Sequence, residues 1–217
     1  SFHLVELPSA VHNGRPVHDA RGSVLDPADC IQHGSLELSR FAPVSAASCR
    51  MGKPAPVPLD VKIDPKRCMG TWYVQYAIPA AAFIEKGAHN GTEQYNYDDA
   101  TGKVTVTYTF NEGSFDGPIN RSAQRGRVSP KSINGTIWNV KPIIGPCVFP
   151  VWLDYLVIDL DTAAYSYLTA SAPGGWWLYV MTRDQEVTDA SLEPRLEVLK
   201  QFGFDCSLLT RMPQKAS

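Results

Sequence analysis

The sequence lacks any long apolar run. No stretch of its 217 residues approaches the roughly 18 consecutive apolar residues that a membrane-spanning helix needs. The first ten residues, SFHLVELPSA, also lack the charged and apolar regions of a secretory leader. We therefore expect a soluble chain without a transmembrane segment, from which any targeting peptide has already been removed.

The sequence also lacks an excess of basic charge. Its 20 Lys and Arg residues stand against 22 Asp and Glu residues, which gives a formal net charge of -2. No cluster of Lys and Arg is evident on any face that can be anticipated from the sequence. Nucleic acid is therefore not expected as a partner.

Cysteine and histidine are scarce and scattered. The five cysteines show no CxxC spacing, which argues against a zinc site; they are Cys30, Cys49, Cys68, Cys147 and Cys206. Four of the five histidines fall within the first 33 residues, and His89 stands alone. We expect no metal and no nucleophile beside a base. One or two disulfides, with Cys147 or Cys206 as a partner, would indicate an oxidising compartment, and isolated buried thiols are the alternative.

Residues 1–63 differ from the rest of the chain. They are rich in Pro, Ser, His and Ala and show neither the 2-residue nor the 3.6-residue apolar period. We expect an extended arm with little regular structure. A segment that cannot build its own core is ordered by docking, here either on its own domain or on another protein.

Residues 64–217 contain eight runs that are typical of strands. In 103–110, KVTVTYTF, apolar residues alternate with threonines, which indicates one buried and one polar face. The other runs are 70–78, 90–98, 122–129, 135–142, 154–161, 164–171 and 176–183, and turn-forming stretches separate them. Eight consecutive antiparallel strands can close into an up-and-down barrel with room for one small ligand.

One helix is expected after the last strand. Thr188 or Ser191 is suited to its N-cap, Leu192, Leu196 and Leu199 form an apolar stripe, and Gly203 can end it. The predicted fold class is therefore all-β: an eight-stranded antiparallel up-and-down barrel, with one C-terminal α-helix packed outside and an extended N-terminal arm.

Three short motifs resemble those of the lipocalins. They are the start of the first strand at Gly70 and Trp72, the stretch DLDTAAY at 159–165 with Asp161, and Arg183 after the last strand. The stretches 83–98, 110–119, 176–187 and 203–214 are similar to the bacterial and plastid branch of that family. The resemblance implies that Trp72 closes one end of the barrel and that Arg183 lies across its indole face, in a cation–π contact.

Side chains alternate between the two faces of a strand. If Trp72 and Arg183 face inward, this alternation predicts which residues line a cavity. The candidate ligand-binding residues are Val74, Tyr76, Ile78, Glu93, Tyr95, Tyr97, Val106, Tyr108, Phe110, Trp138, Val140, Tyr155, Trp177, Tyr179 and Met181. Such an aromatic lining suits a lipid, a fatty acid, or a carotenoid, chlorophyll or other pigment. A barrel filled by its own side chains is the alternative, and Glu93 then bonds to an internal tyrosine or water.

Three functions follow as hypotheses. The first is a carrier of one small hydrophobic molecule. The second is a structural subunit of a larger complex, such as a photosynthetic membrane complex, docked through residues 1–63. The third, an enzyme that modifies xanthophylls or lipids, ranks last because no catalytic group is evident. The similarity to plastid lipocalins favours the lumen side of the thylakoid as the location, and a secreted or periplasmic location is the alternative.

Overall fold

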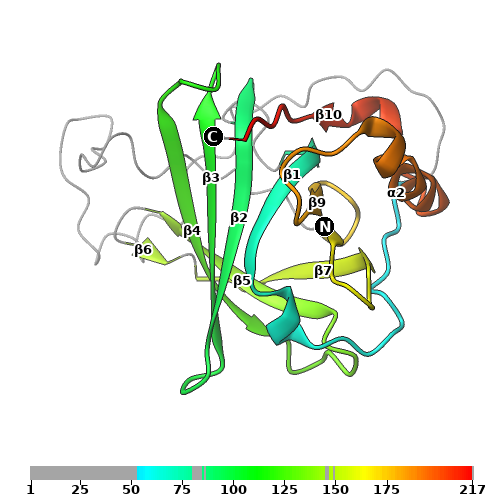
Figure 1. Cartoon of the computed structure of the whole chain (residues 1–217). Helices are drawn as coiled ribbons and strands as arrows, with labels where there is room; N and C mark the ends of the chain where they lie inside the picture. Colours follow the sequence, from blue (N-terminus) through cyan, green and yellow to red (C-terminus); the bar gives the residue numbers. More distant parts are fainter. Residues whose placement is uncertain (1–52, 80–84, 86, 145–146, 149, 217) are drawn as a thin grey trace, which may run out of the picture.

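A computed structural model of the chain describes residues 53–216, apart from 80–84, 86, 145–146 and 149 (Figure 1). Eight of its strands form a closed antiparallel barrel, because each pairs with the next and the first pairs with β9. These strands are β1 (Gly70–Ile78), β2 (Ala88–Asp98), β3 (Lys103–Glu112), β4 (Ile119–Val128), β5 (Ile137–Ile144), β7 (Leu153–Leu160), β8 (Tyr167–Ser171) and β9 (Leu178–Thr182). The predicted up-and-down barrel is confirmed, and each strand overlaps its predicted run.

The alternation read from the sequence is visible in β3. Val104, Val106, Tyr108 and Phe110 are all buried, whereas Lys103 and Thr105 are exposed. The buried residues belong to the cluster that fills the inside of the barrel. A strand with one apolar side therefore forms the barrel wall, since its apolar face can only be removed from water on the inside.

Two short strands were not expected, namely β6 (Cys147–Val148) beside β5 and β10 (Thr210–Arg211) beside β1. Two residues are too few to show a period. β10 begins a C-terminal segment that lies between β1 and β2, which pair directly only over 70–73 and 92–95. In that segment the Met212 amide donates to Gln75 O at 2.9 Å, and Pro213 O accepts from the Asn90 amide at 2.8 Å.

One helix, α2 (Asp189–Gln201), packs against the outside of the barrel, on the right of Figure 1. Thr188 is its N-cap, and Gly203 beyond its end has a φ of 81°, as the sequence predicts. Leu192 and Leu199 are fully buried in a second apolar cluster with the outward residues of β7 and β9. Arg195 adds an ion pair to Asp159 at 2.9 Å. The barrel therefore buries apolar surface on both sides of this part of its wall.

The last part of the predicted arm is bound to its own barrel. The Leu59 amide donates to Val157 O at 2.8 Å, and the Ile63 amide donates to Asn134 O at 2.9 Å. Residues 53–63 form no helix or strand. Residues 1–52, with the rest of the arm prediction, lie outside the described residues. The docking that the structure shows is thus on the same chain.

A β-bulge in β1 corrects the predicted orientation of two side chains. The pairing with β9 shifts between Val74 and Tyr76, so that Gln75 is the additional residue. After a bulge the alternation changes phase. Tyr76 and Ile78, which were predicted to face inward, instead pack with the outer cluster beneath α2. Ala77 takes the inward position.

Cys68 and Cys206 are free thiols, so the structure does not bear out a disulfide at Cys206. Burial raises the pKa of the Cys68 thiol to about 12, which keeps it protonated and unreactive. Cys30 and Cys49 lie outside the described residues, as does the side chain of Cys147. Within the described ranges, no helix has the length and apolar character to cross a membrane.

Candidate functional site: the barrel interior

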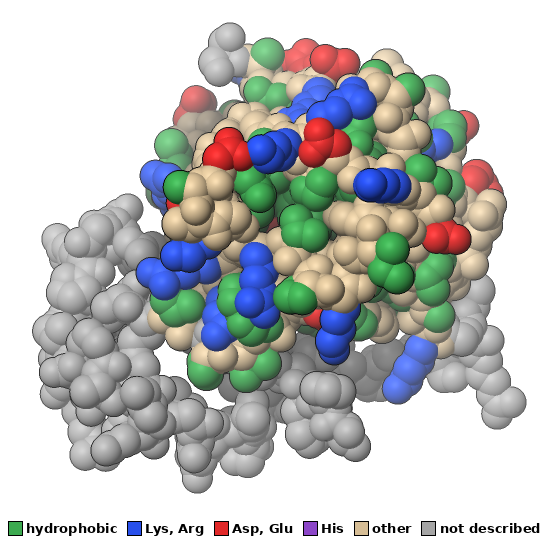
Figure 2. Space-filling model, turned by 90° about the horizontal axis from the view of Figure 1, so that it is seen from below, with side chains coloured by type: hydrophobic (Ala, Val, Ile, Leu, Met, Phe, Trp, Pro, Cys, Tyr) green, Lys and Arg blue, Asp and Glu red, His purple; other side chains and the backbone are tan. Residues whose placement is uncertain are grey.

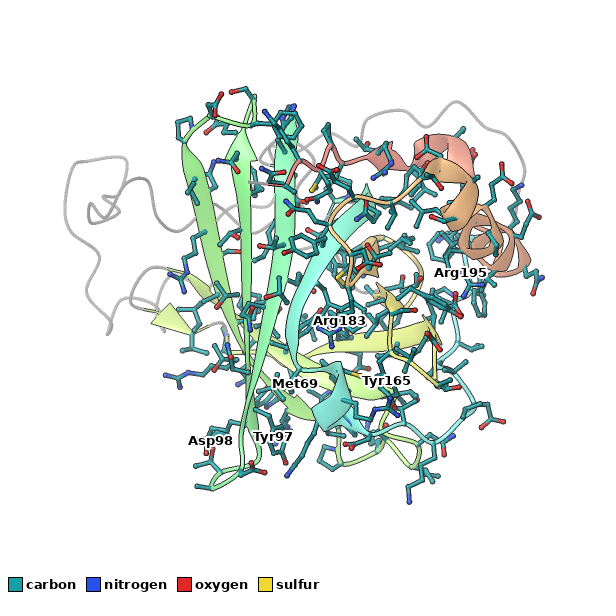
Figure 3. All side chains as sticks on the ribbon, viewed as in Figure 1. Met69, Tyr97, Asp98, Tyr165, Arg183 and Arg195 are labelled. Atoms are coloured by element: carbon teal, nitrogen blue, oxygen red, sulfur yellow. The ribbon has the colours of Figure 1, made fainter. Side chains whose placement is uncertain are left out.

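The floor of the barrel is formed by Trp72 and Arg183, as the motifs imply. The Arg183 guanidinium carbon lies 3.7 Å from the centroid of the Trp72 ring. The same guanidinium donates to the carbonyl oxygens of Thr71 at 2.7 Å, Met69 at 2.8 Å and Arg67 at 3.0 Å. Figure 3 shows Arg183 and Met69 close together near the lower end of the barrel. This arrangement joins the last strand to the start of the first.

Gly70 and Asp161, the other two motif residues, also serve this closed end. A Cβ on Gly70 would come within 3.3 Å of the Arg183 guanidinium, and its φ of 95° already favours glycine. Asp161 accepts from the Ala164 amide at 3.0 Å and the Ser166 hydroxyl at 2.6 Å. These bonds, with the Ser166 hydroxyl first, lower the pKa of the Asp161 carboxyl to about 2. All four motif residues thus have contacts at the closed end of the barrel.

Above the floor, aromatic rings follow one another up the interior. Trp138 stacks on Tyr155 with centroids 5.7 Å apart, and Tyr155 meets Trp177 at 5.0 Å. Trp177 is 4.9 Å from Tyr179, and Tyr179 is 5.4 Å from Tyr108. Such pairs contribute about 0.5–1.5 kcal/mol beyond the burial of their area. The rings therefore form a continuous aromatic surface inside the barrel, from Trp138 on β5 to Tyr108 on β3.

Glu93 is a carboxyl group buried within this aromatic surface. Its β2 position is paired with Trp72 on β1, and its side chain is 1% exposed. The hydroxyl groups of Tyr95 and Tyr155 both donate to Glu93 Oε2, the latter at 3.2 Å. Burial raises the pKa of Glu93 to about 7, although the two tyrosine bonds oppose the shift. Near neutral pH this carboxyl thus changes between its charged and neutral forms.

Glu85 is a second carboxyl at the upper end of the interior, from the segment that joins β1 to β2. It accepts from the Tyr179 hydroxyl at 2.8 Å and from the Tyr108 hydroxyl at 3.2 Å. Burial, followed by the charge of Glu85, raises the pKa of both tyrosines. Both hydroxyl groups therefore remain protonated donors. The Glu85 contacts join three segments across the upper end of the barrel.

Twelve of the fifteen nominated lining residues are buried inside the barrel. They are Val74, Glu93, Tyr95, Val106, Tyr108, Phe110, Trp138, Val140, Tyr155, Trp177, Tyr179 and Met181. Tyr97 is only partly buried and lies at the lower end, where the Lys66 ammonium is 5.2 Å from its ring centroid. Tyr76 and Ile78 lie outside, as described above.

The inner cluster also contains residues that the sequence analysis did not nominate, among them Leu168 and Ala170 of β8. Glu85 and Met212 are two further interior residues, and they lie outside the predicted strands. Glu85 lies in a connection without any period, and no pattern places it against Tyr108 and Tyr179. Met212 belongs to the C-terminal segment, and its sulfur occupies the space that a side chain on Gly91 would need. The glycine within a predicted strand was a signal for a close approach, but it did not identify the approaching residue.

The described residues contain no group of three His, Cys, Asp or Glu side chains placed to hold a metal ion. Among the described residues, the ionisable groups inside the barrel include several tyrosines and two separate glutamates, Glu93 and Glu85. Such groups can hydrogen-bond a neutral polar group.

Comparison with known proteins gives a family for most of the chain. A family model described as a lipocalin-like domain matches residues 63–214. Over 66 residues the chain is 32% identical to the outer membrane lipoprotein Blc of Vibrio cholerae. That segment is 30% of this chain and 39% of the lipoprotein, so the match spans well under half of that relative's length.

Solved structures show the same fold at low sequence identity. Insecticyanin from the tobacco hornworm Manduca sexta has a TM-score of 0.53 and 17% identity, over 75% of this chain and 88% of that one. Lobster apocrustacyanin A1 has a TM-score of 0.50 and 11% identity, over 76% and 93%. Ex-FABP, described as a siderocalin with dual ligand specificities, has a TM-score of 0.50 and 12% identity, over 70% and 97%.

Proposed function

The chain belongs to the family of lipocalin-like domains, and on that premise we propose that it binds one small hydrophobic molecule inside the barrel. The observation that carries this proposal is the aromatic surface between Trp138 and Tyr108, which rises from a closed floor and contains the buried carboxyl of Glu93. Binding sites for small molecules are mostly apolar and have a few placed polar groups.

The ligand takes the place of side chains that now touch across the barrel. Tyr95 on β2 contacts Tyr155 on β7, and Tyr108 on β3 contacts Tyr179 on β9. Tyrosine side chains can rotate about χ1, so these contacts can separate without a change in the strands. The bonds of Glu85 to Tyr108 and Tyr179 must break as well, which makes the upper end the route for ligand uptake.

The polar groups favour a ligand with a neutral, hydrogen-bonding end over a carboxylic acid. A hydroxyl group on the ligand can replace a tyrosine hydroxyl as the donor to Glu93. A carboxylate would instead meet the charge of Glu93 or Glu85, and two like charges in an apolar interior are unfavourable. Among the candidate guests, an alcohol of a polyene, a carotenoid or a neutral lipid therefore fits better than a fatty acid.

Retinol and retinoic acid provide a matched test, because they share one polyene and differ only in the head group. We expect ligand fluorescence and tryptophan quenching to show saturable 1:1 binding at pH 8, with retinol bound about tenfold more tightly than retinoate, a difference of about 1.4 kcal/mol. The difference should shrink in Glu93→Gln and remain in Glu193→Gln, which alters an exposed glutamate of α2. Failure of both retinoids and of a neutral polyene lipid to bind would overturn the proposal.

Extraction of the native protein with organic solvent, followed by an absorption spectrum and mass spectrometry, identifies the natural guest. A conjugated absorption band that co-purifies in a 1:1 ratio supports a pigment, and a saturated lipid mass supports a carrier of simple lipids. A location outside the cytoplasm is part of this proposal, because the relative from Vibrio cholerae is an outer membrane lipoprotein. The plastid location rests on sequence resemblance alone.

A further inference from the structure

The outer wall of the barrel carries a group of cations on β3, β4 and β5, which we name the basic face. Its members point outward because they alternate with inward residues along each strand; they are Lys103, Arg121, Arg125, Arg127 and Lys141. The sequence analysis found no basic cluster, and the structure corrects this. The five residues are spread over 39 positions of the chain, and only the pairing of three strands brings them together.

The register places like charges directly opposite each other. Lys103 pairs with Arg127 across β3 and β4, and Arg125 pairs with Lys141 across β4 and β5. Directly opposed like charges destabilise an antiparallel pair. None of the ion pairs found among the described residues includes a member of the basic face. Stability of the fold does not explain these cations.

An indole lies between two of the cations. The Arg127 guanidinium is 4.2 Å and the Lys141 ammonium 4.8 Å from the Trp152 ring centroid. Trp152 is still 36% exposed, and its neighbour Val151 is 57% exposed. Trp152 thus presents apolar surface to solvent at the same place as positive charge.

Acids border the basic face, and the one closest in register, Asp98 on β2, pairs with Lys103. Asp154, on β7, accepts from the Asn139 amide at 2.6 Å, and Glu112, at the end of β3, accepts from the Asn120 amide at 3.1 Å. Both carboxylates are thus hydrogen-bonded to amides. Figure 2 shows Lys and Arg side chains gathered with hydrophobic side chains on the side of the barrel where Figure 1 places β4 and β6. A chain with a net charge of -2 therefore concentrates positive charge on one wall.

We propose that the basic face docks the protein on an anionic lipid bilayer. The outer wall of a barrel is convex, so it can meet a deformable surface of headgroups more readily than enclose a peptide. Lys and Arg are attracted to anionic headgroups, and tryptophan settles at the boundary between headgroups and acyl chains. Val151 and Trp152 supply the apolar contact, and Ile119, 70% exposed, lies separately at the other end of β4.

Flotation with lipid vesicles tests the proposal on the full chain. Vesicles of phosphatidylcholine with 30% phosphatidylglycerol are compared with vesicles of phosphatidylcholine alone, at 0.1 M and 0.5 M NaCl. We expect binding to the anionic vesicles at low salt and its loss at high salt, because the screening length is about 10 Å at 0.1 M and shortens as salt is added. Equal binding to both vesicles, or binding to neither, would overturn the proposal.

Variants locate the docking surface. Arg125→Glu/Lys141→Glu should weaken binding to anionic vesicles by more than tenfold, because each basic residue near the membrane contributes about fivefold in affinity. Lys53→Glu/Lys62→Glu makes the same change of charge at two exposed lysines of the docked arm and should weaken it far less. Equal losses in the two double variants would mean that only net charge matters, which contradicts the proposal.

Two further variants test the docking surface with changes that are less disruptive to folding. Lys103→Gln/Arg121→Gln alters two other members of the basic face, on β3 and β4, and introduces no negative charge, and it should weaken binding about tenfold or more. Trp152→Ala should weaken it several-fold, whereas Leu208→Ala, at another exposed apolar residue, should leave it unchanged. Circular dichroism checks that each variant is folded. Retinol binding reports the interior, so a failure of the proposed ligand site and a failure of the basic face are distinguishable.

Discussion

The two ends of the barrel hold their charged groups in different ways. At the closed end, Arg183 donates to backbone carbonyls and Asp161 accepts from backbone amides, and these partners move only with the main chain. At the upper end, the Glu85 carboxyl is bonded to two tyrosine hydroxyls, which leave when a side chain rotates. The closed end is thus held by backbone groups, and the bonds at the upper end are made by side-chain hydroxyls; the ligand uptake proposed above requires the second kind of contact to open.

Substitution of Trp72, which forms the floor, should cause the largest loss of stability. Trp72→Ala empties a fully buried indole site and breaks the contact with Arg183, so we expect a loss of about 3–5 kcal/mol in the free energy of unfolding. Trp152→Ala removes the same side chain from the partly exposed outer wall and should cost much less. Urea denaturation measures both. A loss below about 1 kcal/mol for Trp72→Ala would show that the floor is not a structural plug.

Glu93, just above the floor, should make stability depend on pH. Its pKa of about 7 in the folded chain exceeds the ordinary value of 4.5, so the folded state holds the proton more tightly than the unfolded state. Wild-type stability should therefore fall as the pH rises from about 4.5 to 7 and stay lower above. Glu93→Gln should remove this loss and be more stable than wild type by about 2–3 kcal/mol at pH 8, but not at pH 4.5.

Denaturation curves at pH 4.5, 6 and 8 measure this difference. Glu193→Gln, on the exposed side of α2, serves as the control. A constant difference between Glu93→Gln and wild type at all three pH values would contradict the raised pKa.

The planar guanidinium of Arg183, with its several donors, should contribute more to stability than its positive charge alone. Arg183→Lys keeps a cation near Trp72 but cannot reach three carbonyl oxygens from one planar group, so we expect a loss of about 2 kcal/mol. Arg121→Lys, on the outer wall, is the matched control and should change stability by less than about 0.5 kcal/mol. Similar stabilities of the two variants in urea would argue that the floor needs only positive charge.

A substitution at the upper end should change the rate of ligand association more than the stability of the fold. Glu85→Gln weakens the bonds to Tyr108 and Tyr179, so we expect retinol to associate several-fold faster, with a change in stability below about 1 kcal/mol. Stopped-flow fluorescence measures the rate. An unchanged rate with normal affinity would place the route of uptake elsewhere.

The β1 bulge explains why part of the candidate lining was wrong. A period of two, continued from Trp72 and Val74, places Tyr76 and Ile78 inside, but one additional residue at Gln75 reverses the alternation. Gln75 is fully buried and donates to Thr182 Oγ1 at 2.8 Å, so its polar side chain is satisfied within the wall. A polar residue inside an apolar strand was the available signal.

The sequence by itself determined the order of the eight strands and their inward and outward faces in regular segments, because the local period is sufficient for these features. The contact of Trp72 with Arg183 was expected only from the resemblance of short motifs to the lipocalins. Only the tertiary structure decided the position of Glu85 and Met212 in the interior, the docking of residues 53–63, and the assembly of the basic face. These features depend on contacts between segments that are apart in the chain, and the alternation within one segment does not specify which other segment it meets.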